Sequence, residues 1–279
     1  MPDSLLWVTV IAVGAVVGSF LNVVIYRLPQ RQSLMFPGSH CFSCGEHLTW
    51  PDLVPVLSYL VLRGRCRHCG RSFSVRYALV ELATAGLAAL TVYNYGLNAY
   101  ALVIFLACAG LVVAFFVDLD HMIIPDEVPA LLIGLGILVD VYRLISVGSS
   151  ATLSFAEELG GKSYLLHLPV SLTGMLWGGG LLLIIGWIFE RALRRPALGM
   201  GDVKLAAGMG ALLGPGYLFL CFFLLAIITG AVVSVLLMAL QLKRREHAIP
   251  FGPMLALAAV VMLLWPDVIA PWVLHFYGG

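Results

Sequence analysis

Long apolar runs, separated by short polar segments, follow one another along the whole chain. A helix that crosses a bilayer needs roughly 20 apolar residues, and fewer where neighbouring protein shelters it. Eight runs come close to that length, and the sixth of them is short and rich in glycine. We expect membrane-spanning helices at about 5–26, 78–94, 99–117, 128–146, 168–189, 203–214, 216–240 and 253–275. The pattern predicts an all-α polytopic membrane protein with about eight transmembrane helices.

Two segments break this pattern. Residues 28–77 are polar and contain several arginines and cysteines, so we expect a small cytoplasmic domain between the first two helices. Residues 148–166 are rich in Ser and Gly, and we expect an external loop there. The predicted organisation is a first transmembrane helix over 1–27, a cysteine domain over 28–77 and a second transmembrane domain over 78–279.

Charge supports the membrane assignment and suggests an orientation. Hydrophobic residues make up 61% of the chain and charged residues only 11%, against about 25% charged residues in soluble domains. Fourteen of the sixteen Lys and Arg fall in or beside segments on one side of the predicted helices. Cytoplasmic loops carry this excess, so the N-terminus is predicted on the outer side of the membrane. We expect the lipid bilayer as surroundings and no nucleic-acid partner.

The cysteines of the polar domain occur in a doubled pattern. "CFSCGEHL" (41–48) and "CRHCGRSF" (66–73) are two C-x-x-C-G motifs, separated by twenty-one residues. This spacing is typical of a four-thiolate zinc ribbon, and a cytosolic location argues against disulfides. A redox dithiol is the alternative. The predicted metal ligands of a structural Zn²⁺ are Cys41, Cys44, Cys66 and Cys69.

Aspartates stand at the predicted cytoplasmic ends of two apolar runs. "FVDLDHMIIPDE" ends the third run and "LGMGD" opens the sixth, which places Asp118 and Asp202 at the same membrane depth although they are 84 residues apart. A carboxylate in a membrane segment is costly and marks a functional site. Two carboxylates that face each other can share one proton, so that one polarises a water molecule while the other donates to a carbonyl oxygen.

Each of these carboxylates has a structural alternative. Asp126 could cap the fourth helix, and Asp202 could be the N-cap of the sixth. Asp120 lies on a different helical face from Asp118 and could support the pair or stay in solvent. Gly199 and Gly201, before Asp202, would let another segment approach closely.

Taken together, these motifs resemble a known family. They are "GSFLNVVIYRLP" (18–29), the doubled C-x-x-C, "VLSYLVLRGRCRHC" (56–69), "RYALVELAT" (76–84), "DLDHMIIPD" (118–126) and "GMGDVKLAAGMGALLG" (199–214). In this order the chain resembles a bacterial type IV prepilin peptidase of the bifunctional kind, the prepilin leader peptidase/N-methyltransferase. The resemblance covers about residues 15–252.

The resemblance implies a GxGD aspartic protease of the membrane. Such enzymes cut the leader of type IV prepilins, or of type II secretion pseudopilins, after a glycine at the cytoplasmic face. They then methylate the new N-terminus with S-adenosylmethionine. The first aspartate of D-x-x-x-x-x-x-P maps to Asp118, since Pro125 follows seven residues later, and the aspartate of G-x-G-D maps to Asp202.

Residues for methyl transfer are harder to place, because no glycine-rich cofactor loop is present. The cytoplasmic domain and the adjoining helix ends provide the candidates, which are Asn22, Arg27, Gly64, Arg76 and Glu81. A hydrogen bond between helices is the alternative role for Asn22, and pairing with a nearby arginine is the alternative for Glu81.

Two other functions remain open from the sequence. A peptidase without methylation is one, although the complete cysteine domain argues against it. The other is a zinc-ribbon membrane scaffold or an ion transporter. Transport carboxylates usually lie near the bilayer centre, whereas these are predicted at the inner mouth.

Overall fold

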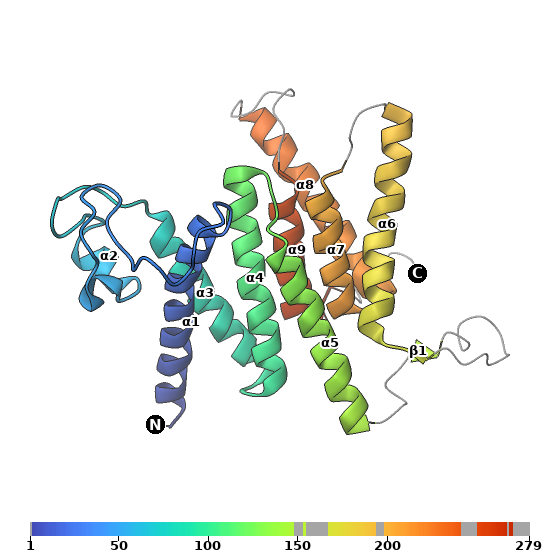
Figure 1. Ribbon diagram of the computed structural model, residues 1–279. Coiled ribbons are helices and arrows are strands. Elements are labelled where there is room, and N and C mark those ends of the chain that lie inside the picture. The colour runs from blue at the N-terminus through green and yellow to red at the C-terminus, as the bar shows by residue number, and fades with distance from the viewer. Residues whose placement is uncertain are drawn as a thin grey trace. The chain divides into compact units, whose positions relative to one another are not determined.

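A computed structural model describes residues 2–147, 153–154, 167–193, 198–240, 250–266 and 268–269. The chain forms two compact units, Met1–Val117 and Asp118–Gly279 (Figure 1). Most of the predicted external loop 148–166 lies outside the described residues, as do six basic residues used for the orientation: Lys162, Arg194, Arg195, Lys243, Arg244 and Arg245.

Within the described ranges, eight long helices correspond to the eight predicted runs. They are α1 (Pro2–Arg27), α3 (Arg76–Tyr95), α4 (Ala99–His121), α5 (Glu127–Val147), α6 (Val170–Leu193), α7 (Met200–Leu213), α8 (Tyr217–Ala239) and α9 (Gly252–Leu264). The predicted all-α fold class is confirmed, with one pair of two-residue strands as the exception. Five of these helices, α1, α4, α5, α6 and α8, are long and apolar enough to cross a membrane by themselves.

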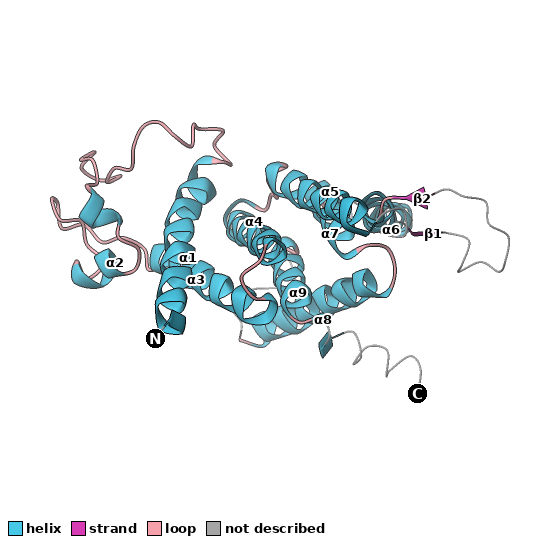
Figure 2. Cartoon of the chain, turned by 90° about the horizontal axis from the view of Figure 1, so that it is seen from below, coloured by secondary structure: helices cyan, strands magenta, loops and turns pink. Residues whose placement is uncertain are grey.

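The remaining elements in the described part of the chain are short. A 3₁₀ turn, η1 (Trp50–Leu53), and α2 (Leu57–Val61) belong to the cysteine domain between α1 and α3. Strands β1 (Leu153–Ser154) and β2 (His167–Leu168) pair in antiparallel fashion next to α6 (Figure 2).

In the N-terminal unit, α1 packs along α3 through small residues. A Cβ atom added at Gly14 would lie 2.7 Å from Ala88 Cβ, and one added at Gly18 would lie 2.7 Å from Glu81 Cα. Such close approach between helix backbones is typical of membrane helices, where dispersion contacts replace the hydrophobic effect between helices. The contact brings the C-terminal half of α1 beside Glu81.

In the C-terminal unit, α7 is enclosed by longer helices. It packs against α5 and α6 (Figure 1), and α9 packs against α8. Gly174 of α6 and Gly210 of α7 face each other so closely that a Cβ on either would collide with the carbonyl group of the other. α7 has only 14 residues, and this close packing holds it in a fixed register beside α6.

Candidate active site and metal centre

Asp118 lies in the last turn of α4, which continues to His121, four residues beyond the end of the apolar run at 117. Only 5% of the surface of Asp118 is exposed. The backbone N–H of Met122 donates to the Asp118 carbonyl at 3.0 Å, and the helix ends where Met122 takes a φ of +54°. A buried carboxylate needs hydrogen-bond donors. The backbone N–H of Gly252 donates to the Asp118 carboxylate.

Asp202 lies in the first turn of α7. Gly199, with extended backbone angles, is the N-cap, and the Asp202 carboxylate accepts a hydrogen bond from the Gly199 backbone N–H. An acidic residue at the third helical position of a capping box makes the same contact. The alternative that Asp202 is itself the N-cap is therefore wrong.

The two aspartates line one pocket. The two carboxylates are close enough for their charges to interact. The pocket is otherwise mostly apolar, and its other lining residues are Met122, Leu198, Gly199, Phe223, Ile227, Pro250 and Phe251. A carboxylate pair in such surroundings can hold one proton between its members and activate a water molecule.

The residues predicted to support Asp118 and Asp202 differ in their position relative to the pocket. Asp120 is exposed and is not among the residues that line the pocket, whereas Pro125 is buried where the chain enters α5. Gly201 lies against Ile124, because a Cβ at Gly201 would be 3.1 Å from Ile124 Cβ. This contact brings the start of α7 next to the segment that follows α4.

Asp126 lies directly before α5 and forms an ion pair with Lys204. Lys204 Nζ donates to Asp126 Oδ1 at 2.7 Å, and both side chains are largely in solvent, with 46% of Lys204 and 71% of Asp126 exposed. The pair joins the segment before α5 to the first turns of α7, on which Asp202 lies.

The four predicted cysteine ligands come together in the N-terminal unit. Their sulfur atoms lie within 4.8 Å of one another, and Cys41 Sγ is 3.9 Å from Cys69 Sγ. Four sulfurs at 2.3 Å from a tetrahedral ion would be about 3.8 Å apart. None of the four forms a disulfide. The cluster can hold a metal ion.

The two cysteine motifs fold into equivalent knuckles. Cys41 N–H donates to the Glu46 carbonyl and Gly45 N–H to the Cys41 carbonyl, and the second motif repeats both bonds with its own residues. Gly45 and Gly70 have φ of +73° and +69°, which glycine adopts without strain. Backbone N–H groups of Cys44 and Ser43 donate to the Cys41 sulfur and lower the pKa of its thiol to about 6, which favours the thiolate form that binds metal.

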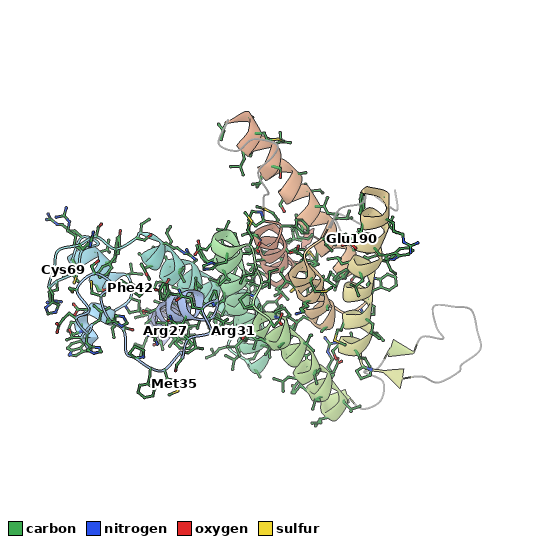
Figure 3. All side chains as sticks on the ribbon, turned by 45° about the horizontal axis from the view of Figure 1, so that its top comes forward. Arg27, Arg31, Met35, Phe42, Cys69 and Glu190 are labelled. Carbon is green, nitrogen blue, oxygen red and sulfur yellow. The ribbon has the colours of Figure 1, made fainter. Side chains whose placement is uncertain are left out.

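A pocket in the N-terminal unit contains most of the methyl-transfer candidates. Asn22, Arg27, Gly64 and Glu81 line it, whereas Arg76 does not. Sequence reasoning did not single out its aromatic wall, which consists of Tyr26, Phe42, Tyr59, Phe73 and Tyr77. In the view of Figure 3, Phe42 lies between Arg27 and the metal-site residue Cys69.

Asn22 and Glu81 also make hydrogen bonds that hold this unit together. Asn22 Nδ2 donates to the Tyr77 carbonyl at 3.0 Å and so joins α1 to α3, as its structural alternative predicts. Glu81 Oε2 accepts from the backbone N–H of Val56 at 2.7 Å, so its partner is an amide of the cysteine domain rather than an arginine.

The two arginine candidates differ in place. Arg27 is buried at the end of α1, and its guanidinium donates to the carbonyls of Ser33 and Pro37, which holds that loop in place. The Arg76 guanidinium donates to the Phe116 carbonyl and lies 4.8 Å from the Phe116 ring centroid. Arg76 therefore holds the start of α3 against α4. Its contact on α4, Phe116, precedes Asp118 by two residues in the sequence.

Comparison with known proteins covers both units. The family model described as Bacterial Peptidase A24 N-terminal domain matches residues 12–95, and that described as Type IV leader peptidase family matches residues 104–235. A Prepilin leader peptidase/N-methyltransferase of Pseudomonas putida is 33% identical over 276 residues, which are 91% of this chain and 88% of the relative. The chain belongs to the type IV leader peptidase family.

Two further relatives of this chain are also named Prepilin leader peptidase/N-methyltransferase. The protein of Legionella pneumophila is 32% identical over 297 residues, 97% of this chain and 96% of its own length. That of Pseudomonas aeruginosa is 31% identical over 291 residues, 96% of this chain and 93% of its own length. No solved structure matches the chain. The peptidase-family match includes both pocket aspartates but stops before α9.

Proposed function

We propose that this protein removes the leader peptide of type IV prepilins or type II secretion pseudopilins and then methylates the new N-terminus. The observation that carries the proposal is the single pocket that Asp118 and Asp202 share, although they come from different helices. The relatives that match nearly the whole chain bear the name of both activities.

In the proposed cleavage, the aspartate pair acts as acid and base. One carboxylate accepts a proton from a water molecule, whose oxygen forms a bond to the scissile carbonyl carbon. The other carboxyl group protonates the carbonyl oxygen, and the C–N bond then breaks as the leaving amine takes up a proton. Phe223 and Phe251 form part of the apolar wall beside the pair. The scissile bond is expected after a glycine at the cytoplasmic face.

The aromatic pocket of the N-terminal unit is the proposed site of methyl transfer. When bound, S-adenosylmethionine supplies a methyl group on a positively charged sulfonium. The residues that would hold it fit this chemistry, because the rings of Tyr26 and Phe42 offer stacking faces for a nucleobase and a cation. Glu81 would provide the negative charge for an ammonium group, and Arg27 the positive charge for a carboxylate.

We assign the cysteine cluster to a structural Zn²⁺. Four thiolates complete a tetrahedral shell and leave no open position for catalysis. The cysteine domain has few elements of its own, so metal binding would supply much of its folding free energy. Metal-dependent folding would also keep the pocket residues that belong to this domain, such as Gly64, in place.

The protein is a multi-pass protein of a bacterial inner membrane. Its proposed orientation has the N-terminus outside and the cysteine domain and the aspartates at the cytoplasmic side. A basic leader, water and a methyl donor can all reach that side.

Incubation of the purified protein with a prepilin and labelled S-adenosylmethionine tests the proposal. A shortened pilin that carries the label at its N-terminus is the expected product. Cleavage without incorporation of the label would show that the protein is a peptidase without methyltransferase activity. An unchanged prepilin would overturn the proposal in favour of the scaffold or the ion transporter.

A further inference from the structure

Helix α9 begins directly against the buried Asp118. Its first residue is Gly252, and the Gly252 backbone N–H donates to the Asp118 carboxylate. A Cβ atom at this position would lie 2.6 Å from Asp118 Oδ2 and 2.9 Å from Asp118 Cγ. Real Cβ atoms essentially never show contacts this short. A side chain at residue 252 would therefore displace the carboxylate or the start of the helix.

The first turn of α9 leaves one amide for this contact. Phe251 is the N-cap, and its carbonyl accepts hydrogen bonds from the N–H groups of Met254 and Leu255. Pro253 has no N–H. The Gly252 N–H is therefore available to donate a hydrogen bond to a carboxylate. The partial positive charge at a helix N-terminus also favours a carboxylate there.

Asp202 is held in the same way. It accepts a hydrogen bond from the Gly199 backbone N–H, and a Cβ at Gly199 would lie 3.1 Å from Asp202 Oδ2. Each carboxylate of the pair therefore receives an amide from a glycine at a helix start. Gly199 belongs to the same turn of chain as its aspartate, whereas Gly252 reaches Asp118 from a helix more than 130 residues later.

Packing fixes the position of Gly252. The buried side chain of Ile124 lies between the starts of two helices, because Cβ atoms at Gly201 and Gly252 would each be 3.1 Å from it. The segment after α4, the start of α7 and the start of α9 meet on this side chain. Gly252 is held close to Asp118 by this contact.

We propose that Gly252 is a positioning residue of the peptidase site. Its amide fixes the orientation of the Asp118 carboxylate toward Asp202, and its missing side chain leaves the space that this carboxylate occupies. The peptidase site is then built from three helix ends, those of α4, α7 and α9. This inference rests on the proposed cleavage by the aspartate pair.

The test is the Gly252→Ala variant, assayed as the full-length protein on a prepilin. Because a displacement of about 1 Å can cost on the order of 10²-fold in rate, we expect kcat to fall by about that factor. KM should stay within about twofold, since the substrate still meets the same pocket wall. Methyl transfer to a pre-cleaved pilin should remain, because it belongs to the N-terminal unit, and an unchanged thermal unfolding transition should show that the C-terminal unit is folded.

Two further variants make the test specific. Gly134→Ala is the matched control, because Gly134 lies in α5 of the same unit and a Cβ there meets nothing within 4 Å. Ile124→Val combined with Gly252→Ala gives the new methyl group room beside Ile124 but leaves its collision with Asp118. We expect the double variant to cleave as slowly as the single one, and it serves as the test if the single variant does not accumulate.

Three outcomes decide the matter. A low kcat in both Gly252 variants with normal methyl transfer supports the proposal. Restoration of kcat by Ile124→Val, or a wild-type kcat in Gly252→Ala, would show that the glycine serves packing alone and would overturn it. Failure of the wild-type protein to cleave any prepilin would instead reject the proposed function itself.

Discussion

At the scale of single residues, neighbouring carboxylates of one motif have different surroundings. Asp118 is buried and faces Asp202, whereas Asp126 is exposed and pairs with Lys204. An exposed ion pair contributes about 0–1 kcal/mol to stability, because water screens it. A buried pair that shares a proton cannot be replaced by a neutral isostere without loss of its acid–base chemistry.

Asp118→Asn and Asp126→Asn therefore form a matched comparison. We expect Asp118→Asn to abolish leader cleavage, since asparagine keeps the shape but cannot exchange the proton. Asp126→Asn should retain most of the wild-type kcat/KM, because only a solvent-exposed contact is lost. Cleavage rates of both variants on one prepilin check this. A similar loss in both would mean that the Lys204 pair has a part in the chemistry.

At the scale of elements, the two knuckles determine whether the cysteine domain folds. They repeat the same backbone hydrogen bonds and bring four sulfurs into one cluster. The elements between them, η1 and α2, are short. Without a metal ion this segment has little to offset its conformational entropy.

Replacement of one ligand tests this dependence. Cys66→Ser should lower zinc from one tightly bound ion per chain to a small fraction of that, and it should expose residues 28–77 to proteolysis. Cys221→Ser, at a cysteine buried in α8, is the control and should keep its zinc. Metal analysis and limited proteolysis are the measurements. A wild-type protein without zinc, whose four thiols react freely, would contradict the assignment.

The helices could be predicted from the sequence because long apolar runs leave a lipid-exposed chain no other regular structure. The apolar pattern places the end of the third helix before Asp118, yet backbone hydrogen bonds carry α4 past it to His121. The pairing of Asp118 with Asp202 could be predicted because both lie at the same predicted depth in the membrane. Gly252 could not, because its contribution is a backbone amide, and "PFGP" at 250–253 is the only trace of it in the sequence. The aromatic wall around Tyr59 depends on folded loops that no periodicity encodes.

At the scale of the whole molecule, the two proposed activities belong to different units. The aspartates lie in Asp118–Gly279, and the aromatic pocket lies in Met1–Val117. Glu81 lines that pocket and holds Val56 through a hydrogen bond that glutamine can still accept. Its charge can therefore be removed with little change to the fold.

Glu81→Gln should lower methyl transfer on the order of 10-fold or more and leave leader cleavage nearly unchanged. The reason is the loss of the negative charge that would hold the ammonium group of the methyl donor. Gly64→Val should act in the same direction, because Gly64 has a φ of +66° and a Cβ there would lie 2.8 Å from the Tyr59 ring. Glu46→Gln, an exposed residue of the same domain, is the control. Equal losses of both activities in Glu81→Gln would argue against a separate site.

The most direct measurement of the central claim is methyl transfer by Asp202→Asn to two substrates, a full-length prepilin and a pilin already freed of its leader. The division of the chain predicts no methylation of the prepilin, because its amine is never released, and wild-type methylation of the pre-cleaved pilin. If the folded Asp202→Asn protein fails on the pre-cleaved pilin as well, one site performs both reactions and the division is wrong.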